Sequence, residues 1–181
     1  MTKKLAVLLP LLVLLGACST YTTPRYAINA DTNVALKAIG ASNIAIGSFS
    51  GPVSFDNRCR AVGPLAPPDG MTHTAYLKKA LESELKVAGA HAASTPKVIL
   101  SGVVNRLEFS SSRGIMGGSW DIDVTLNSST GKSMVTAEHY EFESGFIGDT
   151  ACKQTAEAYM PTVQNLIEKI VRSPEFIALL Q

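Results

Sequence analysis

The residues best suited to chemistry lie near the middle of the chain. Asp121 and Asp123 are two positions apart in a segment of alternating polar and apolar residues. In a strand their carboxylates would share one face, about 6.5–7 Å apart. Paired carboxylates can act as an acid and a base. A solvated strand face produces the same pattern, and we favour that interpretation here.

No nucleophile or phosphate-binding motif accompanies these carboxylates. Gly117-Gly118-Ser119-Trp120 lacks the Gly-x-Ser-x-Gly pattern and the strand-to-helix context of a nucleophile turn. His139 lies in a predicted strand, where it could form a pH-sensitive contact or be an ordinary, partly exposed residue. His73 and His91 are interpreted as surface residues. Because no catalytic set can be assembled, we do not predict an enzyme, and we expect no cofactor.

The first 18 residues have the layout of a secretory signal peptide. Lys3 and Lys4 precede an apolar run of 11 residues, from Leu5 to Leu15. The run is too short to span a bilayer, which needs about 20 apolar residues. It ends in the tetrad Leu15-Gly16-Ala17-Cys18, in which small residues precede a cysteine.

This tetrad resembles the lipobox of bacterial lipoproteins. The resemblance implies that the Cys18 thiol receives a diacylglycerol, that residues 1–17 are removed as a signal peptide, and that the new amine is acylated. Several buried acyl chains, at about 0.8 kcal/mol per CH₂, make such an anchor effectively permanent. Ser19 does not match the Asp that retains such proteins in the inner membrane. We therefore expect the periplasmic face of the outer membrane; an ordinary signal peptide is the alternative.

Removal of residues 1–17 leaves 164 residues, enough for one domain with a core. It also removes two lysines, so the formal charge changes from +1, with 16 basic and 15 acidic residues, to −1, with 14 and 15. No basic run remains. We therefore expect neither a nucleic-acid partner nor a polybasic membrane surface.

Lipid on Cys18 leaves two cysteines, Cys59 and Cys152, in an oxidising compartment. The simplest expectation is one disulfide between them, and two separate free thiols are the alternative. A zinc site is not expected, because no histidine lies at ligand spacing from either cysteine.

Hydrophobic periodicity predicts one α+β domain at 33–181, preceded by a polar tether at 18–32. We expect one mostly antiparallel sheet of about four strands, with two long helices packed on one face. Residues 34–39 fit either a strand or a short helix. The predicted strands are 43–49, 98–109, 120–126 and 134–142. The predicted helices are 72–88, a long helix from Asp149 or Thr150 that Pro161 should kink or break, and a short one after Ser173.

Two predicted loops are candidates for partner recognition. Gly51–Gly70 is rich in glycine and proline and is unusually long for a compact domain, and Ser110–Gly118 connects two strands. Loops carried on a rigid sheet commonly bind partners. The candidate partner-binding residues are Arg58, Arg60, Arg113, Ile115 and Met116.

Several of these segments resemble the YajG-like envelope lipoproteins. The matching segments are Tyr76–Leu85, Val98–Val104, Asn127–Glu143 and a long helix followed by Ser173-Pro174-Glu175-Phe176. More distantly, the order of elements is similar to the periplasmic domain of the LpoB-type activators of peptidoglycan synthases and to the curli-secretion lipoprotein CsgG. The chain has neither the long linker of the former nor the pore-forming insertions of the latter. The resemblance implies a fold and an envelope location, without a defined activity.

From sequence, the expected function is a lipid-anchored, non-enzymatic binding or assembly accessory that contacts the membrane and an unidentified envelope protein. A small envelope hydrolase and an oligomeric secretion or transport component are the alternatives. Turnover of an ester, peptide or glycan substrate would favour the hydrolase. The size of the acylated protein in detergent would separate a monomer from an oligomer.

Acylation at Cys18 gives the first testable prediction. Because the lipobox cysteine is the acceptor, Cys18→Ala should abolish palmitate labelling and either release a soluble periplasmic form or leave an uncleaved precursor. Labelling and membrane fractionation of the variant in cells measure both effects. Unchanged labelling together with normal fractionation would contradict acylation at this position.

Overall fold

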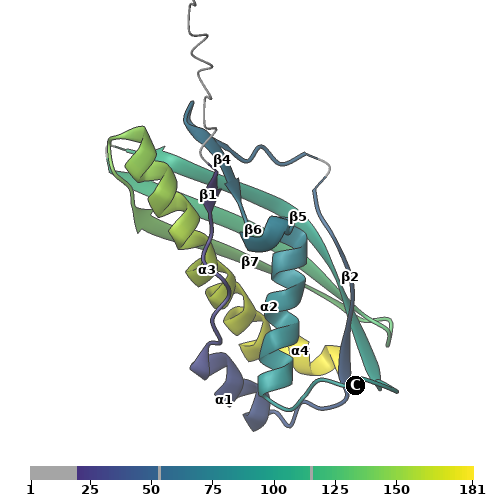
Figure 1. Ribbon diagram of the computed structural model, residues 1–181. Helices are drawn as coiled ribbons and strands as arrows, with labels where there is room; N and C mark the ends of the chain where they lie inside the picture. The colour runs from purple at the N-terminus through teal and green to yellow at the C-terminus, as the bar shows by residue number, and fades with distance from the viewer. Residues whose placement is uncertain (1–19, 53, 115) are drawn as a thin grey trace, which may run out of the picture.

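The computed structural model describes residues 20–52, 54–114 and 116–181. The α+β class is confirmed: a four-stranded sheet in the order β2-β5-β6-β7 carries helices on one face, beside a small sheet in the order β1-β4-β3. Figure 1 shows α2 and α3 on the same face of the larger sheet, with α1 and α4 together at one end.

The larger sheet is a parallel crossover followed by a meander. β2 (Ile44–Ser50) pairs in parallel with β5 (Val98–Arg113), and α2 (His73–Val87) connects them. β6 (Gly117–Ser128) and β7 (Ser133–Glu143) then follow antiparallel through short turns. Most of the predicted loop 110–118 is strand instead, because the pairing of β5 with β6 continues to Arg113 opposite Gly117.

The helices begin and end where the sequence supplies caps. The Thr72 hydroxyl accepts a hydrogen bond from the amide of Ala75 at the start of α2, and Gly89 follows its end with φ +75°. α3 runs unbroken over Gly148–Arg172, although Pro161 lies inside it. Ser173 caps α4 (Pro174–Leu179). The ambiguous segment 34–39 lies in and just after a helix, α1 (Ala30–Ala38), which the Asn29 side chain caps.

The core lies between the sheet and the helices. Alternate residues of β5, β6 and β7 point toward α2 and α3, so the pleat itself sorts the side chains between core and solvent. The largest fully buried side chains are Trp120, Tyr76, Tyr159, Phe176, Leu36, Ile44, Leu65, Leu81, Leu85, Leu100, Ile122 and Leu126.

Residues 21–29, assigned from sequence to the tether, are docked on the domain. β1 (Tyr21–Thr22) pairs in parallel with β4 (Gly63–Ala66). Downstream, the fully buried carboxylate of Glu84 in α2 accepts hydrogen bonds from the Tyr26 hydroxyl at 2.6 Å, the Asn29 amide at 2.7 Å and the Asn33 side-chain amide at 2.7 Å. Three donors compensate the desolvation of this buried charge. Glu84 therefore holds the segment against the helix.

The segment 51–70, predicted as a loop, contains a hairpin and a 3₁₀ turn. β3 (Arg58–Cys59) pairs antiparallel with β4, and the turn spans Pro68–Gly70. The sulfur atoms of Cys59 and Cys152 are 2.03 Å apart, which joins β3 to the first turns of α3. The cysteines expected to pair are thus brought together, and both are fully buried.

We predict that replacing both cysteines, as Cys59→Ser with Cys152→Ser, loosens the β3–β4 hairpin and lowers the stability of the domain. The bond joins residues 93 positions apart. The chain-entropy model gives such a crosslink about 4–5 kcal/mol as an upper figure. Thermal unfolding measures the loss. Tryptic cleavage after Arg58 should accelerate, while cleavage after Arg106, inside β5, serves as the control. If cleavage after Arg58 were equally fast in the native protein and in the double variant, this account of the hairpin would be contradicted.

Candidate functional site

The three arginines predicted to bind a partner are engaged within the protein. Arg58 pairs with Asp56 through two contacts at 2.8 and 2.9 Å, and the pairing lowers the pKa of Asp56 to about 2. Arg113 lies 2.7 Å from Glu141. Arg60 donates hydrogen bonds to backbone carbonyls of β5 and of the segment before α3.

Of the other predicted site residues, Met116, Cys59 and Cys152 lie within the described residues, and two lie outside them. Met116 lies in the turn between β5 and β6, and 66% of its surface is exposed. Ile115 and the lipidation residue Cys18 lie outside the described residues. The disulfide of Cys59 and Cys152 is structural, because it is buried beneath the hairpin.

The outer face of the larger sheet is an accessible surface. In the part of the chain that the structure describes, no helix lies on this face, and the outward residues of β5, β6 and β7 form it. One half of the face is charged and the other half carries exposed aliphatic side chains. We call this surface the open face.

The charged half of the open face is an ion-pair network centred on His139. The Nδ1 atom of His139 is 2.7 Å from Oδ1 of Asp121, its cross-strand neighbour on β6. The Nε2 atom of the same ring is 2.8 Å from Nη1 of Arg113 and 3.3 Å from Oε1 of Glu141. Arg106 adds a contact to Asp121 at 3.6 Å.

An Asp–His pair is part of a hydrolase triad, so the surroundings of this one are decisive. A triad requires a Ser or Cys nucleophile beside Nε2. Here that position is taken by the Arg113 guanidinium and the Glu141 carboxylate. Asp121, the first of the carboxylates considered from sequence, is occupied by His139 and Arg106. Among the described contacts, Nε2 of His139 therefore faces charged side chains and not a Ser hydroxyl or a Cys thiol.

These neighbours alter the protonation of His139. The hydrogen bonds to Asp121 and Glu141 raise the pKa of His139 above its ordinary value of 6.5, against the opposing effects of desolvation and of Arg113. A raised pKa in the folded state means that the protonated ring favours folding. That contribution is present below pH 6.5 and is lost as the pH rises through the raised pKa.

The aliphatic half of the open face is a row across three strands. Thr125 of β6 lies opposite Val103 of β5 on one side and Val135 of β7 on the other. Val135 is 65% exposed, and Ile99 extends the row along β5. β-branched residues pack well on a pleated surface, so they can bury area against a partner without reordering.

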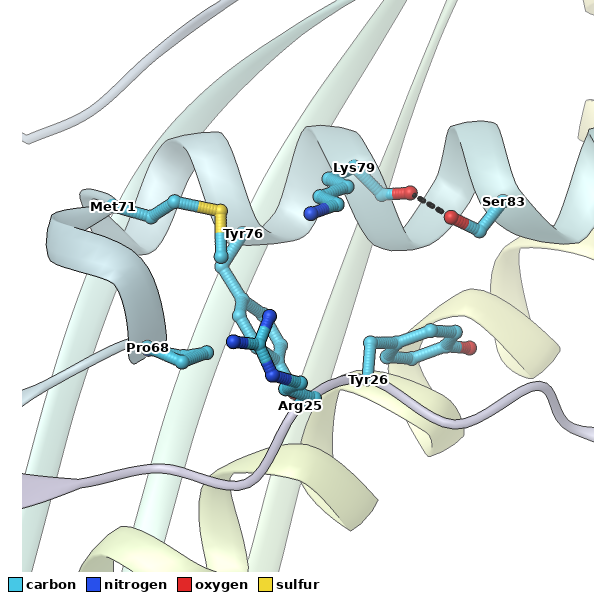
Figure 2. Close-up of a pocket in the computed structure, with 7 residues that line it drawn as sticks. All are labelled: Arg25, Tyr26, Pro68, Met71, Tyr76, Lys79 and Ser83. Carbon is cyan, nitrogen blue, oxygen red and sulfur yellow. Dashed lines mark hydrogen bonds between the residues drawn. The ribbon is translucent and has the colours of Figure 1, made fainter.

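Two hollows lie on the helix side, around Met71. The smaller one, of about 170 Å³, lies between residues 25–26 and α2. Figure 2 shows Tyr26 and Tyr76 in its wall, and the Ser83 hydroxyl bonded to the carbonyl of Lys79. The Arg25 guanidinium beside it is bound to Asp69. The hollow is small and its polar groups are bonded within the protein, so we interpret it as a packing gap between the N-terminal segment and α2.

The larger hollow, of about 420 Å³, lies where the segment 51–70 meets α2, and His73 is in its wall. His73 is buried among the rings of Phe55, Tyr159 and Trp120, at centroid distances of 4.7, 5.0 and 6.1 Å. Burial lowers the pKa of His73 to about 4, so the ring is neutral at pH 7. The sequence analysis took His73 for a surface residue, and this was wrong because Phe55 and the helix packing enclose it.

Within residues 20–52, 54–114 and 116–181, no three His, Cys, Asp or Glu side chains come together in a way that would hold a metal ion. In the same ranges, none of the helices combines the length and apolar character that a bilayer crossing requires.

Compared by sequence, the chain matches no protein-family model and no curated protein. Compared by structure, it is similar to a Xanthomonas campestris protein of the DUF330 family. That similarity covers 84% of this chain and 95% of the other, with a TM-score of 0.54 and 12% identity. This match shows a shared fold.

Two further structures match more weakly. One is a candidate lipoprotein from Caulobacter crescentus, with a TM-score of 0.42, 14% identity, and coverage of 78% of this chain and 90% of the other. The second is the PelC dodecamer from Paraburkholderia phytofirmans, with a TM-score of 0.34, 12% identity, and coverage of 80% and 92%. None of the three is described as YajG-like, LpoB-type or CsgG, so that finer resemblance stays a prediction.

The network predicts a specific change in the titration of His139. Asp121→Asn should lower the pKa of His139 toward its ordinary value, because the variant removes the carboxylate that stabilises the protonated ring. Titration by NMR measures the pKa. Asp123→Asn, two residues along the strand and without a hydrogen bond to His139 among the described contacts, is the matched control. Equal shifts in the two variants would show that Asp121 has no special role.

Proposed function

We propose that this chain is a lipid-anchored protein of the outer membrane, exposed to the periplasm, that binds another envelope protein on its open face without catalysing a reaction. The observation that carries the proposal is the open face itself. It is a rigid surface of three long strands that joins an ion-pair network to a row of exposed aliphatic side chains. The Leu15-Gly16-Ala17-Cys18 tetrad supports the anchor.

The composition of the open face suits protein recognition. Protein interfaces combine an apolar centre, which supplies affinity, with charged groups, which fix register and exclude wrong partners. Val103, Thr125 and Val135 supply the first part, while Arg106, Asp121 and the His139 network supply the second. Both signs of charge are present, so a partner with its own mixed charges is expected.

The arginine-bearing loops chosen from sequence are a weaker candidate for the same role. Their guanidinium groups hold the hairpin, the strand ends and the start of α3 in place. A partner that bound these guanidinium groups would first have to break their hydrogen bonds and ion pairs within the protein. The aliphatic row of the open face presents Ile99, Val103 and Val135, whose exposed side chains have no ion pair to break, and this favours the open face as the docking surface.

Site-specific crosslinking in cells tests the proposal. A photoreactive residue at Val135 should form an adduct of one defined mass. The same residue at Val87, an exposed valine at the end of α2, should form none. Val103→Asp should abolish the Val135 adduct, because a charge inside the aliphatic row opposes its burial. Adducts obtained only from positions 60 and 116 would contradict the open face and restore the loops as the partner site.

A further inference from the structure

Exposed apolar side chains gather on loops at one end of the molecule. Phe146 and Ile147, in the segment between β7 and α3, are 82% and 69% exposed. Met116 lies in the β5–β6 turn, and Val62 lies in the turn of the β3–β4 hairpin. We call these four residues the apolar rim. Large exposed apolar side chains that occur together indicate a surface that something covers.

Three contacts show that the rim residues are neighbours in space. The amide of Ser144 donates to the carbonyl of Met116 at 3.0 Å. Arg60 donates to the carbonyl of Phe146 at 2.7 Å. A Cβ added at Gly148 would lie 2.9 Å from Cγ2 of Val62, so the hairpin turn touches the start of α3. Three chain segments thus present the rim together.

The N-terminal strand reaches the domain at this same end. The Tyr21 hydroxyl donates to Asp149 at 2.7 Å, in the first turn of α3 and two residues after Ile147. Tyr21 also pairs with Leu65 of β4, the strand that follows the Val62 turn. Figure 1 shows β1, β4 and the start of α3 at one end of the molecule, with α1, α4 and the C-terminus toward the other.

The position of Cys18 decides what can cover the rim. Cys18 precedes Tyr21 by three residues, and an extended chain advances at most about 3.3–3.6 Å per residue. An acyl anchor on Cys18 therefore lies within about 10 Å of the docked strand, whatever path the intervening residues take. A bilayer that holds the acyl chains is thus the nearest large surface to the apolar rim.

We propose that the apolar rim is seated in the interfacial layer of the membrane that holds the anchor, so that the domain is oriented and not only tethered. The proposal rests on the lipid anchor of the proposed function. Phe, Ile, Met and Val are apolar side chains that enter the headgroup boundary favourably. Arg60, whose described hydrogen bonds go to neutral oxygen atoms, adds a positive charge near the lipid phosphates.

This orientation has a consequence for the open face. The rim lies at the ends of strands and at the start of α3, not on a face of the sheet. Seating the rim therefore leaves the outer residues of β5, β6 and β7 accessible to a periplasmic partner. The same orientation turns the end with α1 and α4 away from the membrane.

Tryptophan quenching by brominated lipid tests the proposal. Ile147→Trp and Met116→Trp place a reporter in the rim, and Val135→Trp places one at matched exposure on the open face. Each full-length acylated protein is reconstituted into vesicles of phosphatidylethanolamine and phosphatidylglycerol, with or without brominated acyl chains. The native Trp120 is fully buried and supplies the same background in every variant. The rim reporters should lose most of their added emission, and the Val135 reporter should keep it.

The other outcomes separate the rim from the anchor. The mass of the purified protein reports acylation, and sedimentation with vesicles reports attachment. If the protein is acylated and sediments but the rim reporters are not quenched, the rim proposal is wrong and the anchor stands. If all three reporters are quenched equally, the domain has no preferred orientation and the rim proposal is again wrong. A protein without acyl chains would overturn the anchor, and with it the rim proposal.

Discussion

The arrangement of sheet and helices depends on the buried indole of Trp120. Its ring is fully buried, and its N–H donates to the backbone carbonyl of Thr155 in α3 at 2.8 Å. A directional hydrogen bond inside an apolar core fixes the helix along the sheet, which hydrophobic burial alone does not do. Tyr159 and Phe109 pack on the indole at centroid distances of 4.7 and 5.0 Å. This contact holds the N-terminal part of α3 on the sheet, and Phe146 and Ile147 of the apolar rim lie just before that helix.

Two further ties attach the N-terminal half of the chain to this core. The buried carboxylate of Glu84 gathers three donors from residues 26–33, and the disulfide joins β3 to α3. Both ties lie on the helix side of the sheet. The N-terminal segment, the β3–β4 hairpin and the helices therefore all pack on one face of the larger sheet. The opposite face, the open face, stays accessible.

The His139 network shows why residue types alone are a weak guide to catalysis. Asp121 and His139 are at hydrogen-bond distance in an orientation that a hydrolase also uses. What distinguishes the two cases is the neighbour at Nε2, where Arg113 and Glu141 neutralise each other across the strands. The same pair therefore orders a charged surface and shifts the pKa of His139 without providing a nucleophile.

Local patterns were sufficient to predict the main elements. Alternation along Trp120–Leu126, the leucine spacing in α2 and the caps at Thr72 and Ser173 are short-range signals, because each depends on neighbours within a few residues. They placed the meander, two long helices and the terminal helix, and hence the α+β class. The two cysteines that remain beside Cys18 could be expected to pair from their number alone.

Tertiary structure decided what depends on distant partners. Residues 21–29 look like a polar tether until Glu84, more than 50 positions away, supplies the acceptor that docks them. Pro161 did not break α3, and His73 became a buried core residue, because packing outweighs local preference where much apolar surface is buried. The open face and the apolar rim each combine residues from separate strands and loops. The sequence by itself determined the anchor motif and, through the pattern of apolar residues, the four strands of the larger sheet and the two long helices. Only the fold decided the small sheet of β1, β3 and β4 and which surfaces stay exposed, because both depend on residues that are distant in the chain.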